Sequence, residues 1–447
     1  MVNSIQNLKY ITYIPFSKFD KWYVSYYINP HSIKSKYKLE ILSNLITPLK
    51  EKIKKNDYKG DIPVVSKISF ADGKIHLRDE NQTGMDLYKL NLNDLLVSKI
   101  NFHQGAVAIN KICGLVCSTH YQPYKIDNSK INSEYLVLVI RSNGFKDFLS
   151  FLRAEGIKNE ATYEFIGGLE IPLPSIEEQI RIVDNYNAKL RLAQQQEEKA
   201  KTLEIEIEKY LFEELGIEKM IVKPFVKGVL NVFNFSEIFD RWDYNKGSSS
   251  VFSVLHQSKY PVKTLDEAFN FTNRSWNKKT HQEKTFTYVE MGGIDAGLGI
   301  VETTILEVSK APSRATQTIL KGDLIIGTTR PYLKKFAIVT DKNNENIASS
   351  AFQIIAPSED YCLDYLLEYI KSEFGVKQFE YYMTGALYPA ITSKDLRKVL
   401  IPFPPVEKQK QISKHMNSLK SQIKELNILS TKNKEEAIIQ FEKEIFN

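Results

Sequence analysis

The feature that most constrains the fold of this 447-residue chain is an internal repeat. The segment 171–179 (IPLPSIEEQ) returns at 401–409 (IPFPPVEKQ), an offset of 230 residues. Three other matches lie upstream, in the same order in both copies: 19–22 with 239–242, 94–97 with 323–326 and 116–122 with 347–353. One short match would arise by chance, but four collinear matches predict that one fold is present twice.

Both copies have the same internal plan. Short β-rich runs separated by Gly, Asn and Asp turns predict a mixed α/β, mainly β domain at 1–174 and again at 218–404. A proline-rich segment then leads into one long polar helix, at 175–217 in the first copy and at 405–447 in the second. Inside the domains the most prominent expected helices lie at 134–152 and 363–382.

The long helices have recognisable ends and apolar stripes. In the first helix, Ser175 is a suitable N-cap, Glu178 completes a capping box, and Gly216 is a natural stop. In the second helix, Pro405 suits the first helical turn. The second helix has a coiled-coil seam with steps of four and three, formed by Ile412, Met416, Leu419, Ile423 and Leu426 and resumed by Ala437, Phe441 and Ile445. The stripe of the first helix, interrupted by the polar segment 194–199, consists of Ile176, Ile180, Val183, Leu190, Leu203, Ile207, Leu211 and Leu215.

A helix of this length needs a partner. At 1.5 Å per residue each would be about 63 Å long, against roughly 30 Å for the width of a small domain. Because a polar helix is marginal alone in water, and its own duplicate is the partner of matching length, we predict antiparallel packing. The predicted fold class is α+β: two duplicated domains separated by two long antiparallel helices, a coiled coil with pseudo-twofold symmetry. The alternative, two helices packed separately on their own domains, stays open.

Composition limits the class of protein. With 43% hydrophobic and 26% charged residues, the chain can bury a sizeable core. No apolar run approaches the roughly 18 residues of a membrane span, and the first residues lack a secretory signal, so we expect a cytoplasmic protein. Three cysteines form no disulfide framework. The net charge of +6 permits a polyanionic partner without requiring one.

A series of short motifs in the second copy points to a known family. They are 311–315 (APSRA), 321–324 (KGDL), 329–333 (TRPYL), 349–352 (SSAF), 384–389 (TGALYP) and 401–405 (IPFPP). Each is weak alone, but in this order, and half-repeated, they resemble the specificity (S) subunit of type I restriction–modification systems. The resemblance covers nearly the whole chain. It implies two target-recognition domains, 1–174 and 218–404, each followed by a long helical spacer.

The same resemblance implies a function and partners. It implies a sequence-specific subunit that reads a split target in double-stranded DNA, one part per domain. The implied partners are two methyltransferase (M) subunits, which bind S-adenosylmethionine and methylate adenine, and motor-nuclease (R) subunits in the restriction complex. This chain has neither the Asn/Asp-Pro-Pro-Tyr/Phe tetrapeptide of amino-methyltransferases nor a GxxxxGK[ST] phosphate loop. We therefore expect a non-catalytic reader without a cofactor of its own.

Two polar segments of the second copy are candidates for DNA contact. The segment 274–281 (RSWNKKTH) offers cations for phosphates or guanine edges and an amide for adenine. The segment 328–335 (TTRPYLKK) follows an apolar strand, with Pro331 fixing its turn. The candidate residues are Arg274, Trp276, Asn277, Lys278, Lys279, Thr329, Arg330, Tyr332 and Lys334. The alternatives are a solvated loop in the first segment and a tyrosine packed under its own loop in the second.

In the first copy, the counterpart of the second segment is 98–105 (SKINFHQG), where Ser-Lys-Ile-Asn replaces the Thr-Arg-Pro-Tyr stretch. Its polar set is smaller. The candidate DNA-binding residues are Ser98, Lys99, Asn101, His103 and Gln104.

Two further clusters are expected to be structural. Cys113, Cys117 and His120 have a spacing that could suggest zinc, but the duplicate has Ala348 and Ala351 opposite the last two, which favours buried small residues. The Asp-x-Trp pairs at 20–22 and 240–242 lack a nearby acid or histidine and are interpreted as a structural corner.

Two rival functions differ in class. A fused methyltransferase–specificity enzyme is disfavoured because its motif is missing and the repeats occupy the chain. A coiled-coil scaffold without DNA affinity is the other alternative, and salt-dependent binding to duplex DNA would separate it from a DNA reader.

Overall fold

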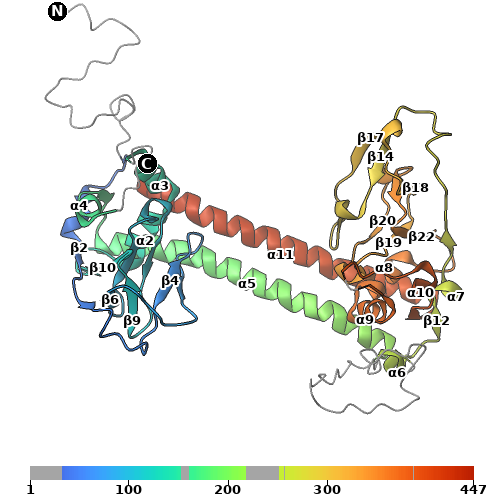
Figure 1. Ribbon diagram of the computed structural model, residues 1–447, viewed down its shortest axis with the longest axis horizontal. Coiled ribbons are helices and arrows are strands. Elements are labelled where there is room, and N and C mark those ends of the chain that lie inside the picture. Colours follow the sequence, from blue (N-terminus) through green and yellow to red (C-terminus); the bar gives the residue numbers. More distant parts are fainter. Residues whose placement is uncertain (1–32, 153–160, 218–250, 256, 386, 447) are drawn as a thin grey trace, which may run out of the picture. The chain divides into compact units, whose positions relative to one another are not determined.

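The computed structural model describes residues 33–152, 161–217, 251–255, 257–385 and 387–446 (Figure 1). The chain divides into two compact units, Met1–Glu197 with Ile428–Asn447 and Glu198–Asn427. Each unit therefore contains one repeat's globular domain and a part of both long helices. The matched segments 19–22 and 239–242, and the structural corner predicted there, lie outside the described residues.

The first unit is built mainly from antiparallel strands (Figure 1). A two-stranded sheet joins β1 (Leu39–Ile41) to β11 (Glu170–Pro172). The main sheet has the order β2 (Ile46–Pro48), β10 (Tyr121–Ile126), β7 (Leu95–Ser98) and β8 (Val107–Ile109). The smaller sheets are β3 (Lys52–Ile53), β6 (Leu87–Leu90), β9 (Leu115–Ser118) and the hairpin β4 (Val65–Ile68) with β5 (Ile75–Leu77). The helices are α2 (Ser133–Arg141), α3 (Asn143–Leu152) and α4 (Tyr163–Gly167).

The second unit repeats this plan. The pair β12 (Val262–Thr264) and β23 (Leu400–Pro402) corresponds to β1 and β11. Its main sheet has the order β13 (Phe271–Thr272), β22 (Phe352–Ile355), β19 (Leu324–Gly327) and β20 (Phe336–Ile338). The other strands are β17 (Thr304–Glu307), β14 (Thr285–Val289), β21 (Ile347–Ser349), β18 (Ala315–Thr318), and the hairpin β15 (Ile294–Asp295) with β16 (Gly299–Ile300). The helices are α6 (Val251–Leu255), α7 (Leu265–Ala268), α8 (Leu363–Lys371), α9 (Glu373–Tyr382) and α10 (Ser393–Arg397).

This correspondence of strand order confirms the predicted duplication. In both main sheets the matched segments 94–97 and 323–326 supply a central, fully buried strand. The buried Asp94 and Asp323 stand just before these strands, and each accepts a backbone N–H from the residue three positions earlier.

One helix prediction needs correction in both repeats. Each expected helix, 134–152 and 363–382, is two helices, with breaks at Ser142 and Ser372. Both serines have extended backbone, and each hydroxyl accepts an N–H from the first turn of the second helix, at Phe145 and Gly375. A serine that caps a new helix interrupts the old one, because the cap residue lies outside the helical conformation.

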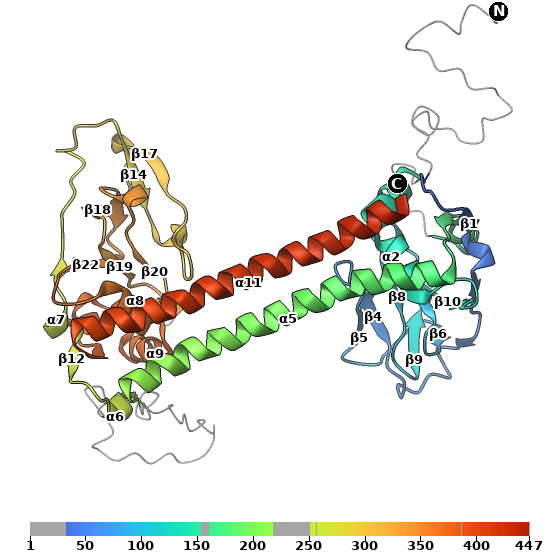
Figure 2. The ribbon, with the colours of Figure 1, turned by 180° about the vertical axis from the view of Figure 1, so that it is seen from behind.

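The long helices are α5 (Ile176–Leu215) and α11 (Val406–Phe446). Inside the first unit, Arg181 pairs with Glu444 and Lys189 with Glu436. Eight residues forward along α5 thus correspond to eight residues backward along α11. Inside the second unit, Lys408 pairs with Glu214 at 2.6 Å, and the rings of Tyr210 and His415 are 4.2 Å apart. The predicted antiparallel pairing is therefore present within each unit (Figure 2).

Each hydrophobic core takes side chains from both long helices. The first core includes Ile182 and Val183 of α5 and Phe441 and Ile445 of α11. The second includes Leu211, Leu215, Ile412 and Met416. Burial of each such side chain contributes about 1.5–3 kcal/mol, so the helix ends are integral parts of the domains.

The predicted apolar stripe of α5 is wrong at Ile180, and in the segment 194–199 polar residues take its place. Ile180 is 43% exposed; its neighbour Gln179 is buried instead and is used for backbone hydrogen bonds. In the polar segment, Gln196 bonds to Asn433 at 3.0 Å and Glu197 accepts from Ser430 at 3.0 Å. Polar contacts hold the helices together where the apolar stripe is missing.

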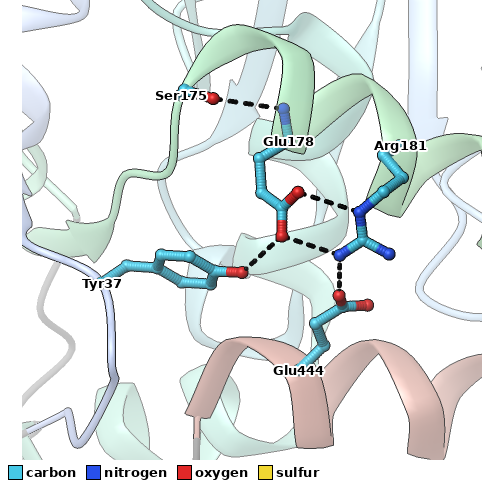
Figure 3. A network of polar contacts seen from close by, with 5 residues as sticks. All are labelled: Tyr37, Ser175, Glu178, Arg181 and Glu444. Atoms are coloured by element: carbon cyan, nitrogen blue, oxygen red, sulfur yellow. Dashed lines mark hydrogen bonds and ion pairs between the residues drawn. The ribbon is translucent and has the colours of Figure 1, made fainter.

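The start of α5 shows how the capping prediction departs from the structure (Figure 3). Ser175 accepts the N–H of Glu178 at 3.4 Å, as an N-cap does. The Glu178 carboxylate, however, binds Arg181 at 2.7 Å and Tyr37 at 2.9 Å. Hydrogen bonds from Arg181 and Tyr37 lower the pKa of Glu178 to about 2. Because Arg181 also pairs with Glu444, this glutamate helps to join α5 to α11 instead of closing a capping box.

Candidate nucleic-acid interface

The segment 328–335 forms a tightly held loop at the end of β19. Thr329 makes a β-bridge with Ala390, and the N–H of Arg330 donates to the carbonyl of Pro389 at 2.7 Å. Arg330 has the left-handed backbone conformation, with φ of 48°, and precedes the short 3-10 helix Pro331–Leu333. A non-glycine residue in this conformation is uncommon, and such residues cluster at functional sites.

The side chain of Arg330 is positioned by the segment that follows α9. Its guanidinium lies 5.2 Å from the ring centre of Tyr388, and Nη2 donates to the carbonyl of Leu387 at 3.3 Å. Tyr332, Leu387 and Tyr388 are exposed. The arrangement presents a planar cation among apolar surfaces, which suits contact with base edges and stacked bases.

Leu387 and Tyr388 were not among the predicted site residues. In the sequence, their segment 384–389 contributes only to the family resemblance. The cation–π contact with Arg330 spans 58 positions of the chain, so no local pattern indicated it.

Two lysines follow in the same loop. Lys334 is half-buried and also has a positive φ, of 55°. Lys335 is half-buried, and its Nζ donates to the carbonyl of Ile294 in β15. The loop is therefore tied to the neighbouring hairpin.

The segment 274–281 is divided between structural and exposed residues. Arg274 makes a bidentate ion pair with Asp323, at 2.5 and 2.9 Å, and Asp323 is completely buried. The indole of Trp276 lies 4.8 Å from the ring of Phe286 and donates to Nδ1 of His281 at 3.1 Å. The indole therefore packs on residues of its own domain.

The remaining candidates of this segment are exposed. Asn277, Lys278 and Lys279 lie in a turn where the Asn277 side chain accepts the N–H of Lys279 at 2.9 Å. Their position leaves the two lysine side chains directed toward solvent, where they can reach phosphates.

The first-copy loop 98–105 has the equivalent position at the end of β7. Ser98 is buried, and its hydroxyl accepts the N–H of Asn101 at 3.2 Å. Asn101 precedes the 3-10 helix Phe102–Gln104. Lys99 lies 5.8 Å from the ring centre of Tyr88. In this loop His103 is half-buried and Gln104 exposed, whereas Ser98 mainly forms the turn.

The equivalence of the loops extends to their surroundings. The N–H of Ala161 donates to the carbonyl of Lys99 at 2.8 Å, and that of Ile391 donates to the carbonyl of Thr328 at 2.9 Å. Both donors stand just before the N-cap threonine of a short helix, α4 in one unit and α10 in the other. The duplicated fold thus places one candidate loop in each unit.

The cysteine cluster considered for zinc is not assembled as a metal site. Cys117 is buried, which raises the pKa of its thiol, whereas Cys113 is exposed. Across the described residues, no group of three or more His, Cys, Asp or Glu side chains could hold a metal ion. In the same ranges, no helix combines the length and apolarity needed to cross a membrane.

Comparisons with known proteins connect this geometry to a family. Residues 37–204 and 257–434 match the type I restriction modification DNA specificity domain, one match in each repeat. A Methanocaldococcus jannaschii protein assigned as the specificity subunit of the type I restriction enzyme MjaX is 24% identical over 402 residues. That alignment covers 85% of this chain and 84% of the relative.

Two solved structures share the fold. One comes from a study of complex assembly and conformational transition of a type I restriction–modification system. It has a TM-score of 0.57 at 17% identity and covers 91% of this chain and 96% of that one. The other, the HsdS subunit from Thermoanaerobacter tengcongensis, has a TM-score of 0.51 at 18% identity, with 92% and 97% covered. Since the domain match extends over most of the chain and occurs once per repeat, this chain belongs to the type I restriction–modification DNA specificity subunits.

Proposed function

We propose that this chain reads a bipartite sequence in double-stranded DNA, one half with each unit, and directs partner subunits to it. The observation that carries the proposal is the pair of equivalent loops, 98–105 after β7 and 328–335 after β19, in two copies of one sheet. Duplicated loops with different polar side chains can read two different half-sites.

The proposed partners follow from the family. Two M subunits would bind S-adenosylmethionine and methylate adenine, and R subunits would join for restriction in the cytoplasm. The chain itself would act without catalysis and without a cofactor. Because methylation requires the target base to leave the duplex, the reader must hold the DNA while leaving it deformable.

The residues proposed to contact DNA differ in their expected roles. In the second unit, Arg330 and Tyr332 would contact base edges, Thr329 would support the loop, and Lys278 and Lys279 would contact phosphates. Asn277 and Lys334 would add polar contacts at the margin of this surface. In the first unit, Lys99, Asn101, His103 and Gln104 form the corresponding set. Arg274, Trp276 and Ser98 would support the surface from beneath, because their side chains are engaged within the fold.

The domain boundaries are also proposed in functional terms. Recognition would belong to residues 1–174 and 218–404, while 175–217 and 405–447 would set the distance between half-sites. If both units face one side of the duplex, half-site centres should lie roughly one helical turn apart, about 34–36 Å.

The decisive experiment is to map the methylated adenines produced by this chain together with its cognate M subunit. A single split motif, with a fixed gap, supports the proposal. The full chain should also bind duplexes carrying that motif with an affinity that falls as salt rises. A chain that assembles with M subunits but shows no affinity for duplex DNA would instead be a coiled-coil scaffold.

A further inference from the structure

Each unit carries a short hairpin with an exposed apolar side chain at its tip. In the first unit it is formed by β4 and β5, and Phe70 in the turn is 50% exposed. In the second it is formed by β15 and β16, and Leu298 in the turn is 71% exposed. In both repeats the hairpin lies, along the chain, between the edge strand of the main sheet (β2 or β13) and its central strand (β7 or β19).

In the first unit, one cation holds this turn. Arg141, the last residue of α2, donates through Nη2 to the carbonyl of Phe70 at 3.2 Å and through Nη1 to that of Ser69 at 3.4 Å. Gly73, with φ of 71°, lies so close that a Cβ there would be 2.3 Å from Nη1 of Arg141. The turn and the guanidinium are therefore fitted to each other.

In the second unit, a lysine does the same at the equivalent position. Lys371, the last residue of α8, follows Arg141 by the repeat offset of 230, and its Nζ donates to the carbonyl of Ala296 at 2.7 Å. The turn is shaped further by Asp295, whose carboxylate accepts the N–H groups of Gly297 and Leu298, each at 2.8 Å.

These contacts also join each hairpin to the candidate DNA loop of its unit. Arg141 lies 3.5 Å from the carbonyl of Gly105, the last residue of the loop 98–105. Lys335, in the loop 328–335, donates to the carbonyl of Ile294 at the base of the other hairpin. Each hairpin is thus held by the last residue of an equivalent helix, and it is joined to the candidate loop of its unit by Arg141 in the first unit and by Lys335 in the second.

We propose that Phe70 and Leu298 are apolar DNA-contacting tips, one for each half-site, and that Arg141 and Lys371 are positioning residues that hold them. This inference rests on the proposed function. An apolar side chain cannot pair with a phosphate, and the contacts through which it can read sequence are with bases. Two such contacts are known: packing on a thymine methyl group and insertion between base pairs.

The test uses the full chain assembled with its M subunits and duplexes carrying the mapped target. Phe70→Ala should weaken binding about tenfold and relax the requirement for the first half-site only, and Leu298→Ala should do so for the second. The dependence of affinity on salt should stay unchanged, because neither side chain neutralises a phosphate.

Matched controls come from equally exposed apolar residues elsewhere in each unit. Leu92, 50% exposed, is the control for Phe70, and Ile305, 73% exposed, is the control for Leu298. Leu92→Ala and Ile305→Ala should leave both half-sites read as before. If the tip variants behave like these controls while the wild type reads both half-sites, the inference fails and the proposed function stands. If the wild type reads neither half-site, the proposed function itself fails.

Substitutions in the DNA identify the kind of contact. Replacing thymine by uracil in one half-site removes the methyl group. If this weakens binding by the wild type but not by the corresponding tip variant, the tip contacts that methyl group. If binding of the wild type raises the fluorescence of 2-aminopurine in the DNA, and binding of the tip variant does not, the tip inserts between bases. Loss of M-subunit assembly in Phe70→Ala or Leu298→Ala, with DNA affinity of the chain retained, would show that the tips bind protein and would overturn the inference.

The positioning role has its own readout. Lys371→Met should relax the second half-site as Leu298→Ala does, whereas Lys371→Arg should restore it, because a cation that donates to Ala296 is retained. In the first unit Arg141→Met and Arg141→Lys form the equivalent pair. A positioning role is excluded if the methionine variants fold and still discriminate like the wild type.

Discussion

Gln179 and Gln409 make the same hydrogen bonds in the two units. Each is completely buried. Gln179 accepts the N–H of Asn132 at 2.7 Å and donates to the carbonyl of Pro174 at 2.9 Å; Gln409 accepts the N–H of Cys362 at 2.9 Å and donates to the carbonyl of Pro404 at 2.8 Å. One side chain thus ties the start of a long helix to the N-cap residue of the domain helix, α2 or α8, beside it.

Removing this amide should destabilise the second unit. Gln409→Ala leaves the N–H of Cys362 and the carbonyl of Pro404 without their partners. Each buried group left unpaired lowers the free energy of unfolding by about 1–3 kcal/mol. Urea unfolding should show this decrease in the free energy of unfolding, while Gln411→Ala, at an exposed position on the same helix, should change it by less than about 0.5 kcal/mol. Equal stabilities of the two variants would contradict the prediction.

Arg274 should matter more for stability than for DNA binding. Its replacement by Ala leaves the buried carboxylate of Asp323 without its ion-pair partner, which typically costs about 3–5 kcal/mol. Arg274→Met combined with Asp323→Asn should recover much of this loss, because no buried charge remains. Chemical denaturation of both variants measures the difference, and a double variant no more stable than Arg274→Ala would argue against this role for the ion pair.

Arg330 is expected to affect recognition of one half-site. A contact with a guanine edge contributes about 1–3 kcal/mol of discrimination, whereas a phosphate contact weakens binding to all sequences alike. Arg330→Ala should therefore relax the second half-site only, as measured by methylation of duplexes with single base changes. If affinity and sequence preference both remain unchanged, the loop 328–335 has a structural role.

Lengthening both helices should lengthen the gap between half-sites. Four residues inserted after Leu192 add about 6 Å of helix, close to two base pairs of rise. The antiparallel register, with Lys189 against Glu436, requires a matching insertion of four residues after Lys432. The double insertion should leave both half-site sequences unchanged and increase their separation by about two base pairs. Methylation at the original spacing and the original rate would show that the helices do not measure DNA.

The pH dependence of Lys371 provides a further check. Burial, then repulsion from Lys420, lowers its pKa to about 8, although Glu368 and Asp295 oppose the shift and Lys334 adds to it. The folded pKa is thus below that of the unfolded chain, so the unfolded state binds more protons between about pH 8 and 10.5, and the free energy of unfolding should rise with pH in this window. Lys371→Arg should remove this rise in urea unfolding measured at several pH values. A wild type and an Lys371→Arg variant with parallel pH profiles would contradict the shift.

The same titration predicts a change in recognition. Above pH 8, Lys371 loses its charge and its hydrogen bond to Ala296 weakens. Discrimination at the second half-site should decline from pH 7 to 9 while that at the first is steady, because Arg141 keeps its charge over this range. Half-site methylation assays at each pH measure both.

The sequence alone determined the features that depend on local pattern. The repeat offset predicted two copies of one fold, and apolar spacing predicted α5 and α11, with the end of α5 at Gly216, whose φ is 67°. Matching length predicted that these helices pair antiparallel. Such features follow from periodicity and end signals, which are contained in short segments. The breaks at Ser142 and Ser372 were also encoded locally, as caps.

Only the tertiary structure decided which side chains meet. The sequence put Arg274 and Trp276 beside Lys278 and Lys279 as DNA contacts, but the fold brings Asp323 to the first and Phe286 to the second. It also brings Tyr388 to Arg330 and the turns at Phe70 and Leu298 to Arg141 and Lys371. A charged or aromatic side chain reveals its chemistry in the sequence. Its partner is set by the packing of distant segments, because the cost of burying an unpaired polar group depends on everything that surrounds it.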